Sequence, residues 1–154
     1  MMALMKRTPP SSVLLDQQLC FALYAASRSV TAAYRPLLES LGLTYPQYLT
    51  MLVLWEQDGL TVRELGDRLQ LDSGTLTPLL KRLQQAGLVS RQRRRSDERE
   101  VEIRLTAEGE ALREPAKAVP ECMAARLCLS SEDMQRLRDE LKQLAAQLSQ
   151  PTQV

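Results

Sequence analysis

Apolar residues recur at intervals of three and four along most of this chain, which is the spacing of helices that bury one face. The longest run extends from Leu19 to Leu41, over more than three heptads, and Gly42 follows it. Four shorter runs repeat the spacing: Leu49, Leu52, Val53 and Trp55; Leu65 and Leu69; Leu76, Leu79, Leu80 and Leu83; and Met134, Leu137, Leu141, Leu144 and Leu148. The pattern predicts a protein that is mainly α-helical.

Polar residues in front of the central runs predict where their helices begin. Thr44 stands three residues before Gln47, and Thr61 stands three residues before Glu64. Each pair has the spacing of a capping box, in which the two side chains satisfy free N–H groups at the start of a helix. We therefore expect one helix to begin just after Thr44 and a short one just after Thr61.

A second short helix is expected to follow closely. Asp72 can cap its start, and Gly87 can adopt the left-handed conformation that ends a helix. Only about two residues separate it from the preceding helix, and its outer face carries Thr75, Lys81 and Gln85 opposite the leucine stripe. Two short helices joined in this way are typical of a helix-turn-helix.

A β-hairpin is predicted directly after these helices. Residues 88–92 form one strand, and 101–105 form the other, in which apolar and charged residues alternate. The loop between the strands carries Arg93, Arg94, Arg95 and Arg99. A helix-turn-helix followed by an arginine-tipped hairpin is a winged helix, a DNA-binding unit.

The charge distribution supports DNA as the partner. Lys and Arg total 20 and Asp and Glu total 19, so the net charge of +1 excludes a diffuse polycation. Between Lys81 and Arg95, however, the local charge is +6 with no acidic residue. A run of basic residues alone is usually a solvated surface. Beside a helix-turn-helix, it indicates a local surface that binds nucleic acid.

The flanking segments divide the chain around this unit. Thr106 is expected to open a helix that Pro115 and Pro120 kink or interrupt, and Ser130 or Ser131 to cap the last helix. We expect one domain at 13–149 between a flexible tail at 1–12 and a second tail at 150–154. Within the domain, dimerisation helices at 13–43 and 106–149 surround a winged helix at 44–105. Ser11 or Ser12 is available to cap the first helix.

The apolar seams of the first and last helices need a partner. They can pack on each other within one chain or against a second copy of the chain. We expect a homodimer, because a two-fold protein matches two half-sites about one turn of DNA apart.

Several function classes are disfavoured by what the chain lacks. No stretch reaches 18 uninterrupted apolar residues and the first ten residues lack the apolar run of a signal peptide, so we expect a cytoplasmic protein without a membrane segment. The three cysteines are then expected to be reduced. Without histidine, a phosphate-binding glycine loop or clustered cysteines, neither an enzyme nor a metal or cofactor site is expected.

The order of elements resembles that of the MarR transcription regulators. Asp97-Glu98-Arg99 in the wing and 105–109 (LTAEG) after it are similar to the segments that mark this family. Three stretches resemble its OhrR subgroup, repressors that sense organic hydroperoxides through a cysteine on the first helix: 19–24 (LCFALY), 43–48 (LTYPQY) and 71–83 (LDSGTLTPLLKRL). The resemblance covers about 14 to 148 and implies a winged-helix dimer that represses a gene for a thiol-dependent peroxidase.

The resemblance identifies Cys20 as the sensing residue, with Tyr34 and Tyr45 donating hydrogen bonds to its sulfur. Phenol donors favour the thiolate, which is the form that attacks a peroxide. Tyr34 lies fourteen residues beyond Cys20, about 21 Å along one straight helix, so it must reach the sulfur from the other subunit or by a fold-back. On spacing alone Cys20 would be interpreted as a small buried residue in a helical seam.

A second thiol can trap the oxidised cysteine as a disulfide. The resemblance implies a cysteine near the end of the fifth helix, where Cys122 and Cys128 are both candidates. Cys122 is favoured because 119–121 (VPE) resembles the family's approach to that cysteine. The bond is expected to join subunits and to change the spacing of the two wings. The alternatives are a MarR regulator released by a small aromatic ligand, with Cys20 incidental, and a thiol peroxidase.

The expected DNA contacts follow from the exposed faces. Major-groove contacts to phosphates and base edges are assigned to Ser73, Thr75, Thr77, Lys81 and Gln85, with Pro78 against thymine methyl groups. In the wing, Arg93 adds positive charge, and Arg94 or Arg95 enters the minor groove of an A·T-rich tract. Asp97 orients Arg99 or another arginine. The expected partner is double-stranded operator DNA with an A·T-rich inverted repeat, and the expected inducer is an organic hydroperoxide.

Overall fold

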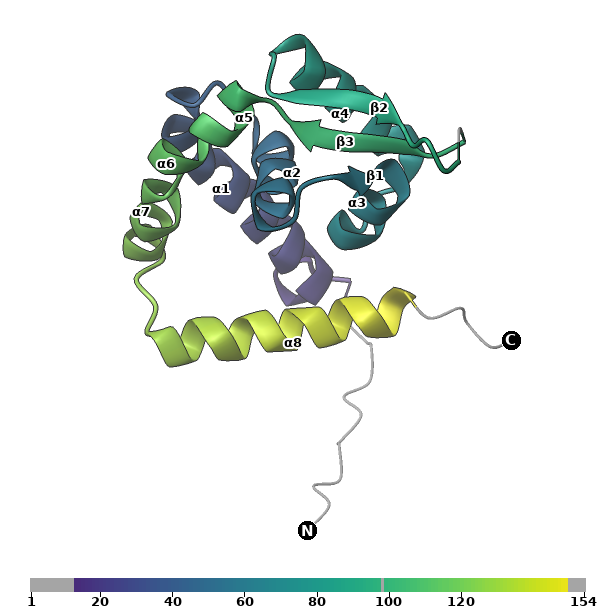
Figure 1. Cartoon of the computed structure of the whole chain (residues 1–154). Coiled ribbons are helices and arrows are strands. Elements are labelled where there is room, and N and C mark those ends of the chain that lie inside the picture. Colours follow the sequence, from purple (N-terminus) through teal and green to yellow (C-terminus); the bar gives the residue numbers. More distant parts are fainter. Residues whose placement is uncertain (1–12, 98, 150–154) are drawn as a thin grey trace, which may run out of the picture.

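The computed structural model of the chain describes residues 13–97 and 99–149. Its elements are, in order, the 3-10 helix η1 (Leu15–Gln17), α1 (Leu19–Glu39), α2 (Tyr45–Glu56), β1 (Leu60–Thr61), α3 (Val62–Leu69), α4 (Ser73–Gln85), β2 (Val89–Arg93), β3 (Val101–Leu105), α5 (Ala107–Ala111), α6 (Arg113–Ala116), α7 (Ala118–Leu127) and α8 (Ser131–Ser149). The predicted fold, mainly α-helical with a small β-hairpin wing, is confirmed (Figure 1). The tails expected at 1–12 and 150–154, and the caps expected at Ser11 or Ser12, lie outside the described residues.

The predicted starts of the central helices are confirmed by their hydrogen bonds. At α2, the Thr44 N–H donates to Gln47 Oε1 at 2.9 Å and the Gln47 N–H donates to Thr44 Oγ1 at 3.4 Å. The same reciprocal pair joins Thr61 and Glu64 at α3, at 2.7 and 3.1 Å. Asp72 Oδ1 accepts from the first turn of α4 at 2.7 Å. Each cap stabilises its helix by about 1 kcal/mol, so local bonds define the limits of the helix-turn-helix.

The wing is an antiparallel hairpin in a three-stranded sheet. β2 pairs with β3, with Val89 opposite Leu105, and the strand order is β1-β3-β2. The sequence analysis did not predict β1, in which Leu60 and Thr61 pair with β3. Two residues are too few to show the alternation of a strand, so only their packing against β3 identifies them.

The helix that follows the wing is interrupted, as its prolines predicted. α5 ends at Ala111 and α6 ends at Ala116, each four residues before Pro115 or Pro120. A proline offers no N–H to the carbonyl four residues back, and its ring presses against that carbonyl. The hydrogen-bond ladder therefore breaks at those two places, and α5, α6 and α7 follow a curve along one side of the molecule (Figure 1).

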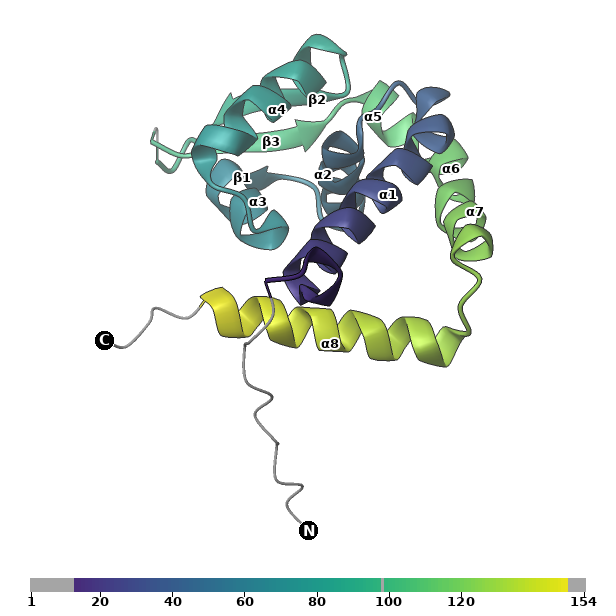
Figure 2. The same cartoon turned by 180° about the vertical axis from the view of Figure 1, so that it is seen from behind.

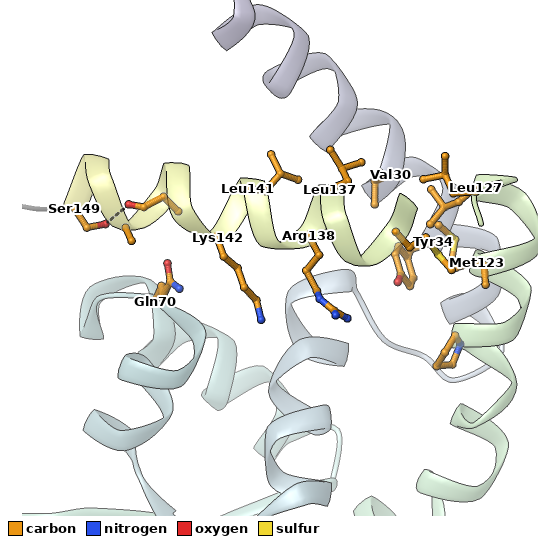
Figure 3. A pocket seen from close by; sticks show the side chains of 16 residues that line it. Val30, Tyr34, Gln70, Met123, Leu127, Leu137, Arg138, Leu141, Lys142 and Ser149 are labelled. Carbon is orange, nitrogen blue, oxygen red and sulfur yellow. Dashed lines mark hydrogen bonds between the residues drawn. The ribbon is translucent and has the colours of Figure 1, made fainter. Parts of the chain in front are cut away.

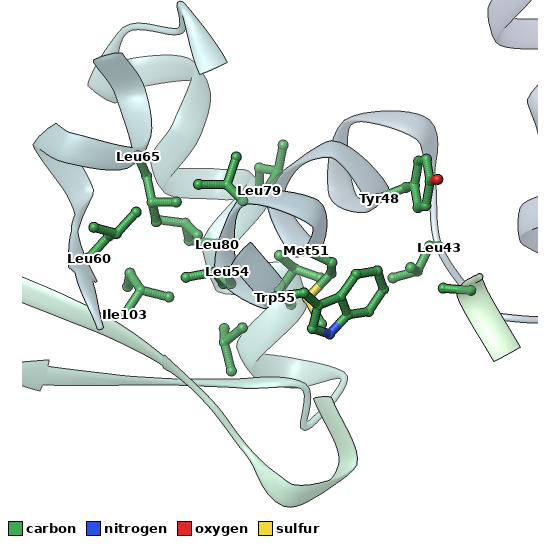
Figure 4. Packing of buried hydrophobic residues seen from close by; sticks show 14 of the residues in the cluster. Leu43, Tyr48, Met51, Leu54, Trp55, Leu60, Leu65, Leu79, Leu80 and Ile103 are labelled. Atoms are coloured by element: carbon green, nitrogen blue, oxygen red, sulfur yellow. The ribbon is translucent and has the colours of Figure 1, made fainter. Parts of the chain in front are cut away.

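The core lies between α2, α3, α4 and the sheet, and it receives the end of α1. Its completely buried side chains are Leu38, Met51, Leu54, Leu65, Leu76, Leu80, Leu83, Val89 and Ile103. Trp55 extends this core toward α5, where its Nε1–H donates to the Gly109 carbonyl at 2.9 Å in a buried hydrogen bond (Figure 4). Because the leucine stripe of α4 is used in the core, the opposite face of that helix is left to solvent.

The last helix, α8, lies apart from this core. In both views it crosses beside the beginning of α1, on the side of the molecule away from the hairpin (Figures 1 and 2). None of its described residues is buried, and Leu137, Leu141 and Leu148 are 46%, 40% and 76% exposed. Leu19 and Phe21 at the start of α1 are exposed as well. Packing within one chain therefore leaves both apolar seams uncovered.

None of the helices in the described ranges has the length and apolar character needed to cross a membrane.

Candidate DNA interface and cysteine site

The recognition helix, α4, separates an apolar face from a polar one. Its four stripe leucines are buried. The residues predicted to meet DNA are all exposed on its other sides: Ser73, Thr75, Thr77, Pro78, Lys81 and Gln85. Apart from Pro78, they offer hydroxyl, amide and ammonium groups to solvent, which are the donors and acceptors that phosphates and base edges require.

Three wing arginines are available for a ligand. Arg93, Arg95 and Arg99 are exposed, and among residues 13–97 and 99–149 no carboxylate lies within ion-pair distance of them. Arg94 differs, because its guanidinium contacts Glu100 and Glu102 at 3.2 Å each and Glu64 at 3.8 Å. The hydrogen bond to Glu102, followed by the charges of these carboxylates, raises the pKa of Arg94 above its ordinary value.

The wing tip is closed by Asp97. Its Oδ1 accepts from the Arg99 N–H at 3.0 Å, and its carbonyl accepts from the Glu100 N–H at 3.1 Å. Asp97 was expected from the sequence to orient Arg99 or another arginine. The contact that the structure provides is to the backbone of Arg99, so Asp97 shapes the turn from which that side chain extends.

A crevice of about 600 Å³ separates the helix-turn-helix from the wing. Asp72 and Ser73 at the start of α4 line one side, and Arg91 and Arg99 of the wing line the other, with Arg63 of α3 between them. Arg63 and Arg91 were absent from the predicted contacts. The position of Arg91 within the basic run of 81–95 was the signal available in the sequence.

The three cysteines are free and exposed. Cys20 is the second residue of α1, at the helix end whose dipole favours negative charge. Tyr24 lies one turn further along, with the Arg28 guanidinium 5.6 Å from its ring centre. α1 continues to Glu39 as one helix that includes Pro36 and Tyr34, so a fold-back of Tyr34 toward Cys20 within one chain is ruled out.

Tyr34 and Tyr45 meet, although they come from different helices. Their ring centres are 4.5 Å apart, and Tyr48, which the sequence analysis missed, lies 5.8 Å from Tyr34 and 6.5 Å from Tyr45. Burial raises the pKa of all three phenols, and neighbouring phenols add to it for Tyr34 and Tyr48. The hydroxyls therefore stay protonated and able to donate. The i, i+3 spacing of Tyr45 and Tyr48 was the signal for the third member.

The two candidate partners for Cys20 differ in their surroundings. Cys122 lies within α7. Cys128 follows that helix with a left-handed backbone, φ +53°, and its thiol donates to the Ala125 carbonyl at 3.3 Å. Between them, Arg126 ties α7 to α1 by donating to the Ala33 carbonyl at 3.0 Å.

An apolar trough of about 1270 Å³ lies between α8 and the rest of the chain (Figure 3). Val30, Tyr34 and Met123 line it from α1 and α7, and Leu137 and Leu141 line it from α8. Within the described ranges no group of His, Cys, Asp and Glu is able to hold a metal ion.

Known proteins share this fold and much of this sequence. A family model described as "Transcriptional regulator SarA/Rot" matches residues 32–114, just over half of the chain. The chain is 49% identical over 136 residues to the "Organic hydroperoxide resistance transcriptional regulator" of Bacillus subtilis (strain 168), which covers 88% of this chain and 92% of that protein.

Two solved structures of AbfR from Staphylococcus epidermidis are similar along most of their length. Reduced AbfR bound to DNA is 40% identical with a TM-score of 0.74, covering 88% of this chain and 95% of that one. Disulfide-formed AbfR is 42% identical with a TM-score of 0.62, covering 85% and 92%.

Proposed function

The chain belongs to the MarR family of winged-helix transcription regulators, in the group of the organic hydroperoxide resistance regulators, and we propose that it is a DNA-binding repressor switched off by oxidation of a cysteine. The observation that carries this proposal is the exposed polar face of α4 beside a wing whose Arg93, Arg95 and Arg99 are exposed to solvent, in a chain whose relatives include AbfR bound to DNA. The regulator acts in the cytoplasm, where its operator lies. Its task is regulation rather than turnover of a substrate.

In the DNA complex, α4 lies in the major groove and the wing reaches the minor groove. Ser73, Thr75, Thr77, Pro78, Lys81 and Gln85 face the bases and phosphates. Of the wing residues, Arg93, Arg95 and Arg99 supply positive charge, and Asp97 shapes the tip. A two-fold dimer presents two such units, so the operator is an inverted repeat with A·T-rich tracts under the wings.

The dimer forms through the seams that one chain leaves uncovered. Leu137 and Leu141 of α8, which line the apolar trough, and Leu19 at the start of α1 are exposed, and a second copy would bury them. The same arrangement brings Cys20 of one subunit to the phenols of Tyr34 and Tyr45 of the other. These phenols donate hydrogen bonds to the thiolate and favour it over the thiol.

The inducing chemistry then has two steps. The Cys20 thiolate attacks the terminal, hydroxyl oxygen of an organic hydroperoxide, and the S–O bond forms as the O–O bond breaks. The leaving alkoxide takes a proton from water and departs as an alcohol, and the cysteine becomes a sulfenic acid. A thiol of the partner subunit, Cys122 or Cys128, attacks this sulfur, and water leaves as the disulfide forms. The new bond draws α7 toward α1, changes the spacing of the wings and releases the operator.

The test is fluorescence anisotropy of the reduced protein on its own upstream DNA, titrated with cumene hydroperoxide. Release of the wild type together with retention of Cys20→Ser is the expected result. If both proteins stay bound, the hydroperoxide is not the inducer, and release by a small aromatic ligand becomes the leading account.

The resolving thiol is identified by non-reducing gels of oxidised protein. A disulfide-linked dimer that disappears in Cys122→Ser and persists in Cys128→Ser assigns the role to Cys122, which we favour. The reverse pattern assigns it to Cys128. Monomer in every oxidised sample rules out a disulfide between subunits.

A further inference from the structure

Arg94 occupies the point where the wing meets the helix-turn-helix. Its backbone N–H donates to the Glu100 carbonyl at 2.9 Å, one residue beyond the last pair of the β2–β3 hairpin. The side chain contacts Glu64 at the start of α3, so it extends from the wing toward that helix. Arg95, the next residue, is exposed and has no such contact within the described part of the chain.

Three carboxylates from two structural units share this guanidinium. Nε donates to Glu102 and Nη1 donates to Glu100, both in the wing, and Nη2 lies 3.8 Å from Glu64 Oε2. That same Glu64 oxygen accepts the Thr61 N–H at 2.7 Å, so it belongs to the capping box of α3. A planar guanidinium with donors in fixed directions can hold several carboxylates at once, which a lysine cannot do.

The neighbourhood of Glu102 is tightly packed. Its side chain is only 13% exposed, and its second oxygen contacts the Arg104 guanidinium. Gly59 lies against this pair with φ +74°, and a Cβ there would be 3.1 Å from Glu102 Oε1 and 3.4 Å from Arg104. The backbone at Gly59 therefore covers the Glu102 end of the cluster, while Glu64 and Glu100 lie at the surface.

We propose that Arg94 is a positioning residue that fixes the wing on the helix-turn-helix and does not itself contact DNA. Its guanidinium is engaged with three carboxylates, which would also repel an approaching phosphate. Apart from this cluster, the strand pairing that joins the start of α3 to the wing is limited to the two residues of β1. The inference rests on the proposed DNA-binding function.

The experiment compares Arg94→Gln with its neighbour Arg95→Gln, by measuring operator and random-sequence affinity at several salt concentrations. Each lost phosphate contact lowers the salt slope by about 0.9. We expect Arg94→Gln to weaken operator binding about tenfold, the size of an interaction within an ion-pair network, while the slope and random-sequence affinity stay at wild-type values. Arg95→Gln should lower the slope and weaken both.

A double-mutant cycle tests the partner. Glu64→Gln keeps the capping box, because glutamine serves at that position, but it removes the charge that Arg94 contacts. We expect this variant to weaken operator binding although it removes a negative charge near DNA, and the double variant to be no weaker than Arg94→Gln. Arg94→Lys, which keeps the charge without the planar fork, should fall between Arg94→Gln and wild type. A cooperative thermal unfolding transition well above the assay temperature shows that each variant has folded.

Two results overturn the inference: a salt slope for Arg94→Gln that falls as in Arg95→Gln, or additive effects of the Arg94 and Glu64 substitutions. In both cases the wild type still binds its operator and the proposed function stands. A wild type that binds no operator overturns the proposed function and this inference with it.

Discussion

Replacing Gly109 by alanine perturbs the junction between the wing and the C-terminal helices. A Cβ at this position would lie 2.1 Å from the Leu88 carbonyl oxygen and 3.3 Å from Leu105 Cδ2, whereas ordinary contacts begin at 3.4 Å. α5 must therefore move more than 1 Å away from the start of β2. The Gly109 carbonyl also accepts the buried hydrogen bond of Trp55 at 2.9 Å, which this movement would stretch.

The magnitude follows from three contributions. Overpacking of this kind costs about 1–3 kcal/mol, and leaving the buried indole N–H without its acceptor costs about 1–3 kcal/mol. The better helix propensity of alanine returns about 1 kcal/mol. We therefore expect Gly109→Ala to lower the free energy of unfolding by about 3 kcal/mol, which corresponds to a Tm lower by about 6–12 °C for a chain of this size.

The assay is thermal unfolding followed by circular dichroism at one fixed protein concentration. Two variants serve as controls. Trp55→Phe removes the hydrogen bond, together with part of the buried ring, without moving α5. Gly66→Ala places a Cβ 2.8 Å from the Leu71 carbonyl oxygen, a smaller intrusion that should cost less. If Gly109→Ala unfolds within about 2 °C of wild type, the close approach of α5 to Leu88 is refuted.

Three further predictions follow from the structure. Leu141→Glu places a charge in the uncovered seam of α8, so the dimer should dissociate at concentrations where the wild type stays dimeric in sedimentation velocity; an unchanged dimer would exclude α8 from the interface. The pKa of Glu64 lies below its ordinary value of 4.5, mainly because the carboxylate accepts the hydrogen bond of the Thr61 backbone. The ionised carboxylate therefore stabilises the fold at neutral pH, and this stabilisation is lost as the pH falls below about 4.5 and through the pKa of the folded state. The free energies of unfolding of wild type and Glu64→Gln should therefore differ at pH 7, and the difference should shrink as the pH falls below about 4.5 in denaturant titrations; a constant difference would contradict this. Asp97→Ala removes the acceptor for the Arg99 N–H, so operator binding should weaken in anisotropy assays while random-sequence binding is retained; unchanged operator affinity would show that the tip needs no such bond.

The sensing site combines a predicted part with a part found only in three dimensions. Cys20, Tyr34 and Tyr45 were named through the resemblance, and the structure brings the two tyrosines into contact at 4.5 Å. Tyr48, which completes the cluster of phenols, was missed because its side chain looks like any other apolar position of α2. Its spacing from Tyr45 places both residues on one face of α2, but only the packing of α1 against α2 brings that face to Tyr34.

What the sequence determined by itself rests on interactions over about four residues. The capping boxes of Thr44 and Thr61, the Asp72 cap and the breaks before Pro115 and Pro120 all depend on bonds within one turn of helix, so they could be predicted and were found. The leucine stripe of α4 is equally local, because one helix period defines it, and with the inner face known the exposed DNA-facing residues follow.

Only the tertiary structure decided the features that join distant segments. Arg94 and Arg95 are adjacent and chemically identical, and no periodicity separates them. They differ because the hairpin turn brings Glu100 and Glu102 to the Arg94 guanidinium and the packing of the wing on α3 brings Glu64, whereas no carboxylate in the described part of the chain lies within ion-pair distance of Arg95. β1 likewise exists through its pairing with β3. An ion pair or a two-residue strand depends on where both partners lie in space, and the order of residue types along the chain does not determine which distant residues come into contact.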